Sequence, residues 1–213
     1  MARLTRAESQ MQTRERLLQS ARAAFLREGY VRASIDAIAE DAGYSKGAVY
    51  SNFAGKEALF LELLKQKFEG EIAALKALAA SHESADDLLA AMREHNGAHP
   101  EVLDFTLVSA EFQTQVARGS QFAETYARLY AGQRKALAEL VTTIFARAGK
   151  ELPAPAEELA GAAIALTIGL AVLRGADRQA VSAQSWGRAA ELYFRGLLAA
   201  ARDVGGSAET RGT

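Results

Sequence analysis

Residues 43–47 have the residue types and spacing that could support nucleophilic catalysis. They read Gly-Tyr-Ser-Lys-Gly, which matches the G-x-S-x-G pattern of the nucleophile elbow in α/β-hydrolases. That elbow exposes a reactive serine only where a strand enters the turn and a helix leaves it. The preceding residues, 35–42, instead have helical periodicity and low β propensity. We therefore predict that Ser45 caps a helix and that the protein is not a hydrolase.

Two histidines offer a different chemistry, the binding of a metal ion. His95 and His99 are four positions apart, a spacing that would place both imidazoles on one face of a helix. Asn96, Gly97 and Pro100 predict a loop instead, and no third ligand is evident. The chain also has no cysteine and no glycine-rich phosphate loop. We expect no metal, no cofactor and no enzymatic activity.

Composition limits the class of protein. The chain has 213 residues, of which 49% are hydrophobic, and it contains only 3 prolines and no convincing alternating strand pattern. These features predict an all-α protein. The polar, basic N-terminus lacks the apolar core of a signal peptide, and the apolar run 159–173 is shorter than a membrane span. We therefore expect a cytoplasmic protein that does not enter a membrane.

Residues 34–52 have the pattern of a helix-turn-helix. Ile35, Ile38 and Ala39 follow the spacing of a helix face packed on a core. Gly43 would end that helix in a positive-φ conformation, and Ser45 would cap the next one. In such a motif the second helix enters the major groove of DNA. A helical hairpin without this function is the alternative. Flanking helices at about 13–28 and from residue 56 instead predict a three-helix DNA-binding headpiece.

The distribution of charge supports this interpretation. The whole chain has a net charge of −1, but residues 1–67 carry +3 and the remainder carries −4. A basic segment attached to an acidic body is typical of a protein that meets phosphates only through that segment. The sequence therefore favours DNA contact through the N-terminal part.

The rest of the chain is predicted to be helical. We expect the helix from residue 56 to continue to about 79, followed by helices at about 85–94, 101–117, 121–148, 156–174 and 182–203. The helix 156–174 is apolar around most of its circumference, so it must be covered on several sides. We favour a two-fold dimer formed by the last two helices of each copy. The alternative is a buried core within one chain. The predicted interface residues are Ile164, Ile168, Val172, Leu192 and Leu197.

Large apolar side chains of the C-terminal part could also line a pocket for a small molecule. An aromatic stripe is the usual content of an ordinary core, which is the alternative here. The predicted pocket residues are Phe68, Met92, Phe105, Phe112, Tyr126, Tyr130 and Trp186, and the polar candidates are Gln113, Gln133 and Arg134.

Residues 13–64 resemble the DNA-binding domain of the TetR family of transcriptional regulators. The resemblance consists of a helix ending in Gly-Tyr, a capped helix, an Ala-Gly turn, Ser-Lys-Gly, Tyr-x-x-Phe and Lys-Glu-x-Leu. It covers about a quarter of the chain. It implies a homodimer, a C-terminal effector pocket, and a change in the spacing of the two headpieces when effector binds. It also implies a DNA-binding domain at 1–54 (linked by helix 55–79) and an effector-binding and dimerisation domain at 55–204. The composition of the last residues, GGSAETRGT, predicts a disordered tail at 205–213.

The resemblance assigns DNA contacts to individual residues. Lys46, Gly47 and Ala48 are expected to face base edges, whereas hydroxyls, amides and a lysine are expected to contact phosphates. Many family members have histidine where this chain has Asn52, so that contact is open. The predicted DNA-binding residues are Ser34, Ser45, Lys46, Gly47, Ala48, Tyr50, Ser51, Asn52 and Lys56. Arg3 and Arg6 are further candidates for a flexible arm.

The predicted function is a ligand-responsive transcriptional regulator, and specifically a repressor. It would bind a palindromic double-stranded operator as a homodimer and leave it when a small apolar or aromatic effector binds. Activation and corepression remain open within this interpretation. The alternative from another class is a helical ligand-binding or enzymatic protein whose headpiece is only structural.

Overall fold

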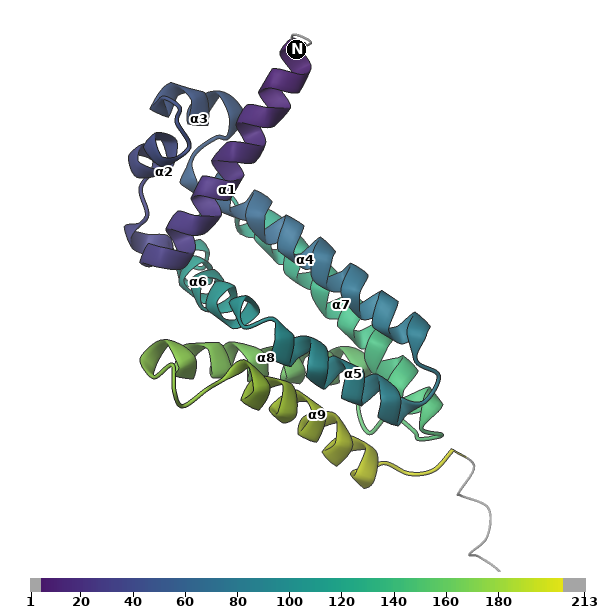
Figure 1. Ribbon diagram of the computed structural model, residues 1–213. Helices are drawn as coiled ribbons and strands as arrows, with labels where there is room; N and C mark the ends of the chain where they lie inside the picture. Colours follow the sequence, from purple (N-terminus) through teal and green to yellow (C-terminus); the bar gives the residue numbers. More distant parts are fainter. Residues whose placement is uncertain (1–4, 205–213) are drawn as a thin grey trace, which may run out of the picture. The chain divides into compact units, whose positions relative to one another are not determined.

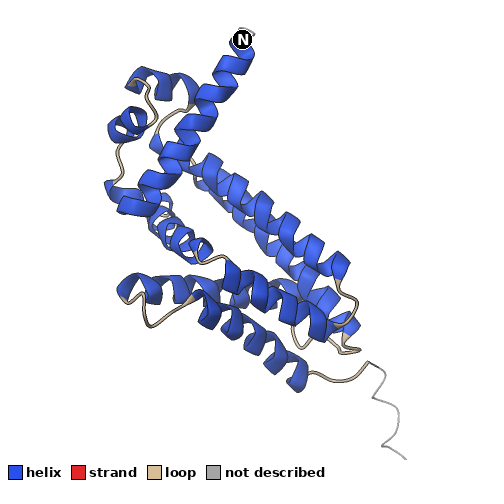
Figure 2. Cartoon of the chain, in the orientation of Figure 1, coloured by secondary structure: helices blue, strands red, loops and turns tan. Residues whose placement is uncertain are grey.

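The computed structural model describes residues 5–204, and all regular secondary structure in that range is helical (Figures 1 and 2). One isolated bridge pairs Lys150 with Asp203. The predicted all-α class is confirmed. The helices are α1 (Arg6–Arg32), α2 (Ile35–Asp41), α3 (Lys46–Asn52), α4 (Lys56–Ser81), α5 (Ala85–Ala98), α6 (Glu101–Val116), α7 (Ala123–Arg147), α8 (Ala156–Ala176) and α9 (Ala183–Ala200).

The helices form two compact units. The first comprises Met1–Phe68 with Val108–Ala127, and the second comprises Glu69–Leu107 with Arg128–Thr213. Helices α4, α6 and α7 therefore each contribute residues to both units. The division by function at residue 54 stays a prediction, because compactness does not test it. The predicted tail at 205–213 lies outside the described residues.

Helix α1 is longer than its apolar pattern predicts. It begins with a capping box, in which the Thr5 side chain accepts a hydrogen bond from the Glu8 backbone and the Glu8 carboxylate accepts one from the Thr5 backbone. The helical assignment continues to Arg32, but Gly29 interrupts it with φ 80° and ψ 166°. The predicted stop at Gly29 is therefore a kink, after which Tyr30 turns into the core.

An aromatic cluster fills the first unit, and its members come from α1, α4, α6 and α7. Phe25 meets Phe60 edge-on at a centroid distance of 5.1 Å, and Tyr30 lies 4.9 Å from Phe112. Phe112 also lies 4.8 Å from Phe60 and 5.7 Å from Tyr126. These five rings are buried, and such ring pairs stabilise a core beyond their burial of apolar area. We call them the aromatic cluster.

The second unit has its own core between α5, α7, α8 and α9. Its fully buried members include Leu88, Leu89, Val141, Ile144 and Phe194. Helices α5 and α9 approach so closely that a Cβ on Gly187 would lie 2.4 Å from the Arg93 carbonyl oxygen. Glycine at this position therefore allows the two helices to pack.

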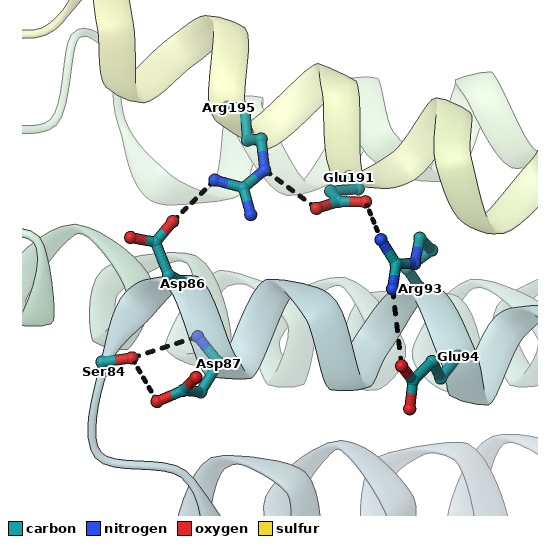
Figure 3. A network of polar contacts seen from close by, with 7 residues as sticks. All are labelled: Ser84, Asp86, Asp87, Arg93, Glu94, Glu191 and Arg195. Atoms are coloured by element: carbon teal, nitrogen blue, oxygen red, sulfur yellow. Dashed lines mark hydrogen bonds and ion pairs between the residues drawn. The ribbon is translucent and has the colours of Figure 1, made fainter.

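Ion pairs line the exposed edge of the same contact (Figure 3). Arg195 of α9 donates to Asp86 at 2.6 Å and to Glu191 at 2.8 Å, and Arg93 of α5 donates to Glu191 at 3.3 Å. Because most of these groups are exposed, they contribute less to stability than the buried leucines do.

One local expectation was wrong. Helix α5 continues through Asn96 and Gly97 to Ala98, where a loop was predicted.

Helix α8 has 21 residues and is apolar enough that, by length and composition alone, it could cross a membrane. Only 22% of its most apolar stretch is buried. A helix covered by other protein meets the same criterion.

Candidate nucleic-acid interface

The α2–α3 motif folds as its glycine and its two serines predict. Gly43 has φ 75°, and its backbone N–H donates to Glu40 at the end of α2. Ser34 and Ser45 are the N-caps of α2 and α3, and their side chains accept hydrogen bonds from Ala37 and Ala48. The predicted cap at Ser45 is confirmed, and its hydroxyl belongs to a helix start rather than to a strand–helix elbow.

Helix α3 has one face in the core and one in solvent. Val49 is fully buried, whereas Lys46, Gly47 and Ser51 are exposed. Tyr50 is 54% exposed, so its side chain can contact a partner. Ala48, which was predicted beside these residues, is half-buried.

The C-terminal end of α3 is held by internal hydrogen bonds. Ser51 and Asn52 both donate side-chain hydrogen bonds to the Ala48 carbonyl, at 2.9 and 2.8 Å. Arg14 of α1 donates to the Asn52 carbonyl at 3.0 Å, pairs with Glu62 at 3.0 Å and lies 4.2 Å from the centroid of the Phe53 ring. The orientation of α3 is therefore fixed by α1 and α4.

Lys46 has an acidic partner within the motif. Its ammonium lies 2.9 Å from Asp36 Oδ1 and 3.0 Å from Asp36 Oδ2, at the first turn of α2. The hydrogen bond to Asp36 raises the pKa of Lys46. The cation predicted to face base edges is thus paired in the free protein.

The Lys56 side chain turns toward the headpiece. Its ammonium donates to the carbonyls of Val31 and Ala33 at 3.0 and 2.8 Å and lies 4.6 Å from the centroid of the Tyr30 ring. Burial lowers the pKa of Lys56, and the charge of Glu111 partly opposes this effect. In this arrangement a phosphate contact from Lys56 would use its backbone N–H at the start of α4.

The seven predicted pocket residues are divided between the two units. Phe68, Phe112 and Tyr126 belong to the first unit, and Met92, Phe105, Tyr130 and Trp186 to the second. Phe112 and Tyr126 are members of the aromatic cluster. Met92 belongs to the core of the second unit, whereas Trp186 packs in a smaller cluster with Leu103, Ala171 and Val181.

The predicted polar candidates are engaged differently. Gln133 donates to Glu71 at 2.9 Å, whereas Gln113 is exposed. Arg134 pairs with Glu157 at 3.4 Å, and its buried Nε has no hydrogen-bond partner among residues 5–204. A cavity of about 170 Å³ lies between α4 and α7, and none of the predicted pocket residues lines it. Its lining residues include Ile72, Leu75, Lys76, Glu139 and Leu140.

The predicted interface residues range from buried to strongly exposed. Ile164 is buried, and Ile168 and Leu197 are half-buried. Val172 is 49% exposed and Leu192 62% exposed, and neighbouring Leu173 is 59% exposed. Helices α8 and α9 therefore present apolar side chains that residues 5–204 leave exposed.

The two histidines lie at the end of α5. His95 is in its last turn, His99 caps it, and the two rings are 4.6 Å apart. Burial, followed by the proximity of His99, lowers the pKa of His95. Among residues 5–204, no group of three or more His, Cys, Asp or Glu residues is arranged to hold a metal ion.

Sequence reasoning missed three residues that shape the interface: Asp36, Arg14 and Glu111. Asp36 binds Lys46, Arg14 holds the end of α3, and the Glu111 carboxylate accepts from the Tyr30 backbone N–H at 2.8 Å. Their partners lie ten or more positions away, so no local pattern identifies them. The excess of anions in residues 34–52 was the available signal for Asp36.

Comparison with protein families identifies the N-terminal region. Residues 17–63 match the model described as bacterial regulatory proteins, tetR family. The HTH-type transcriptional repressor AcnR of Corynebacterium efficiens is 30% identical over 110 residues, which cover 52% of this chain and 54% of that protein. The chain spans 40–54% of the length of three such curated relatives.

Solved structures extend the similarity to most of the chain at the level of the fold. A transcriptional regulator of Rhodococcus sp. Rha1 matches with a TM-score of 0.71 at 23% identity, covering 88% of this chain and 97% of that one. A putative transcriptional regulator of Saccharomonospora viridis, solved in complex with choline, gives 0.70 at 21% identity, covering 85% and 95%. These relatives are regulators rather than enzymes, and residues 17–63 of this chain match the N-terminal domain of the tetR family of bacterial regulatory proteins.

Proposed function

We propose that this protein is a ligand-responsive transcriptional repressor. It binds a palindromic double-stranded operator as a homodimer, in the cytoplasm, and leaves the operator when a small effector binds. The supporting observation is the solvent-exposed face of α3, with Lys46, Gly47 and Tyr50, on a helix whose other side is anchored by buried Val49. A short, rigidly held helix with an exposed polar face is suited to entering the major groove.

Contacts to DNA are expected from a few short side chains. Gly47 and Ala48 allow the backbone of α3 to approach base edges, and Lys46 can donate to guanine. Tyr50 can donate its hydroxyl to a phosphate. Because so few long polar side chains are present, DNA shape and thymine methyl contacts would share the specificity.

Dimer formation is supported by the exposed apolar side chains of α8 and α9. Val172, Leu173 and Leu192 are each about half exposed or more in the single chain. Covering such a surface with a second copy removes it from water and yields a two-fold arrangement of four helices. The same pairing would account for the high hydropathy of α8 without a membrane.

We propose that the effector binds in the C-terminal part of the chain. The regulator of Saccharomonospora viridis was solved with choline, and a similar fold here is compatible with a small apolar or aromatic effector. To move the operator-competent population from nearly all to nearly none, the effector must favour the other state by about 5.5 kcal/mol.

A selection experiment with matched variants tests the proposal. Genomic fragments retained by the purified protein are sequenced and footprinted, and we expect a palindrome whose half-sites are about 34–36 Å apart along the duplex. Leu192→Glu should yield monomers in sedimentation and lose affinity for that site. Leu152→Glu changes an exposed leucine in the segment between α7 and α8 and serves as the control. Fragments without a shared palindrome, or a Leu192→Glu variant that remains dimeric, would contradict the proposal.

A further inference from the structure

The helix-turn-helix carries more anions than cations. Residues 34–52 contain one cation, Lys46, and three anions, Asp36, Glu40 and Asp41, so the motif has a net charge of −2. Phosphate neutralisation by lysine and arginine supplies essentially all of the non-specific affinity of DNA-binding proteins. The state of Lys46 therefore has a large effect on how this motif meets DNA.

Both oxygens of the Asp36 carboxylate hold the Lys46 ammonium, at 2.9 and 3.0 Å. The two side chains are 67% and 54% exposed, so the pair lies on the surface and can be exchanged for a phosphate. Asp41, at the other end of α2, has a different partner, because it pairs with Arg27 at 3.4 Å. Within residues 5–204, Asp36 is the one anion of the motif that forms an ion pair with Lys46.

We propose that Asp36 is a specificity-determining residue, which positions Lys46 toward base edges and keeps its ammonium from DNA phosphates. The inference rests on the proposed DNA-binding function. Phosphate contacts carry no sequence information, whereas base contacts do. A lysine that is restrained by a neighbouring carboxylate gains less from an arbitrary phosphate, and it keeps the orientation that a base contact requires.

The central test is Asp36→Asn, which removes the charge and nearly preserves the shape. Affinity for DNA without the operator should rise by about two- to five-fold per headpiece, the weight of an exposed ion pair. For this variant, the slope of the logarithm of the DNA-binding constant against the logarithm of the salt concentration should become steeper by about one unit per headpiece, because Lys46 then neutralises a phosphate. Operator affinity should rise less, so the ratio of operator to non-specific affinity falls.

Two matched variants separate this effect from general repulsion. Asp41→Asn makes the same charge change on the same helix and should leave the affinity ratio as in the parent. In a Lys46→Met background, Asp36→Asn should have no further effect on the ratio. Equal gains for operator and non-specific DNA, or a persistent effect without Lys46, would overturn the inference.

A second measurement does not need an operator. On immobilised heparin, a polyanion, Asp36→Asn should elute at higher salt than Asp41→Asn, with circular dichroism confirming that both remain folded. Equal elution of the two variants would contradict the proposal that Asp36 restrains Lys46, even if the parent proves to be a regulator. If the parent binds no DNA selectively but the two variants differ on heparin, the proposed function fails while the restraint of Lys46 stands.

Discussion

The Glu111 carboxylate accepts a hydrogen bond from the Tyr30 backbone N–H at 2.8 Å, although the two residues are 81 positions apart in the sequence. The same oxygen lies 3.4 Å from the Val31 backbone nitrogen, at the end of α1. Adjacent Phe112 packs against the Tyr30 ring. Helix α6 thus satisfies the backbone at the kink of α1 and at the same time covers the aromatic cluster.

Glu111→Ala should destabilise the protein. Hydrogen bonds to charged groups contribute about 1.5–3 kcal/mol, and we expect the free energy of unfolding in urea to fall by about that amount. Glu111→Gln should lose less, because its amide oxygen can still accept from Tyr30. Gln113→Ala, at an exposed position of the same helix, should change stability by less than about 0.5 kcal/mol. Equal stability of the Ala and Gln variants at 111 would argue against this hydrogen bond.

Gly29→Ala should also be costly, for two reasons. Gly29 has φ 80° and ψ 166°, a region accessible almost only to glycine, where another residue costs about 1–3 kcal/mol. In addition, a Cβ there would lie 2.9 Å from both oxygens of Glu111. In a Glu111→Ala background the clash with Glu111 is absent, whereas the unfavourable backbone conformation of Ala at position 29 remains. Thermal unfolding of the double variant therefore separates the two costs.

Gly70→Ala is the matched control for Gly29→Ala. Gly70 lies within α4, and a Cβ there would meet no atom of the described residues within 4 Å. Alanine is favoured over glycine inside a helix by about 0.5–1 kcal/mol. This variant should therefore be slightly more stable than the parent, and a loss comparable to that of Gly29→Ala would contradict the backbone argument.

Gly47→Ala should separate stability from DNA binding. The added Cβ would meet only the Ser45 Oγ, at an ordinary 3.6 Å, so the fold should be unchanged or slightly more stable. If Gly47 approaches base edges, the methyl group should weaken operator binding by about tenfold or more, which corresponds to ~1.4 kcal/mol. Gly132→Ala, with nothing within 4 Å of its Cβ, should bind like the parent. Full operator affinity in Gly47→Ala would remove Gly47 from the interface.

Tyr30 should ionise late as the pH rises. Burial, and then the charge of Glu57, raise the pKa of Tyr30 to about 12 from the model-compound value of 10.0. The pKa of Tyr30 is higher in the folded protein than in the unfolded one. The stability that the neutral Tyr30 contributes is therefore complete below pH 10.0 and is lost as the pH rises through about 12. Burial also raises the pKa of Tyr130 and Tyr193, so absorbance titration of Tyr30→Phe should show a late step that is smaller than the parent's by one tyrosine. A late step of unchanged size would contradict the raised pKa of Tyr30.

The helix-turn-helix could be predicted from sequence because its determinants are local. Gly43 and Ser45 act through their own backbone neighbours, so residue type alone indicated the turn and the cap. The early start of α1 had a local signal as well, since Thr5 and Glu8 form a capping box. The scarcity of apolar residues before Leu17 concealed it.

The remainder required tertiary structure. Asn96 and Gly97 are turn residues by propensity, yet they lie in α5, where Gly97 faces Gln184 of α9. Lys56 was expected to reach a phosphate with its charge, but its ammonium satisfies two backbone carbonyls that are 23 and 25 positions away. Packing and distant backbone partners of this kind leave no periodic trace in the sequence.

The most direct test of the account is fluorescence anisotropy with the DNA upstream of the protein's own gene. The comparison is a scrambled duplex of equal length at physiological salt, with the stoichiometry determined in parallel. The account predicts that the upstream site is bound at least about 10³-fold more tightly, with two chains for each operator. Equally weak binding to both duplexes, persisting across a library of genomic fragments with and without metabolite extract, would contradict it.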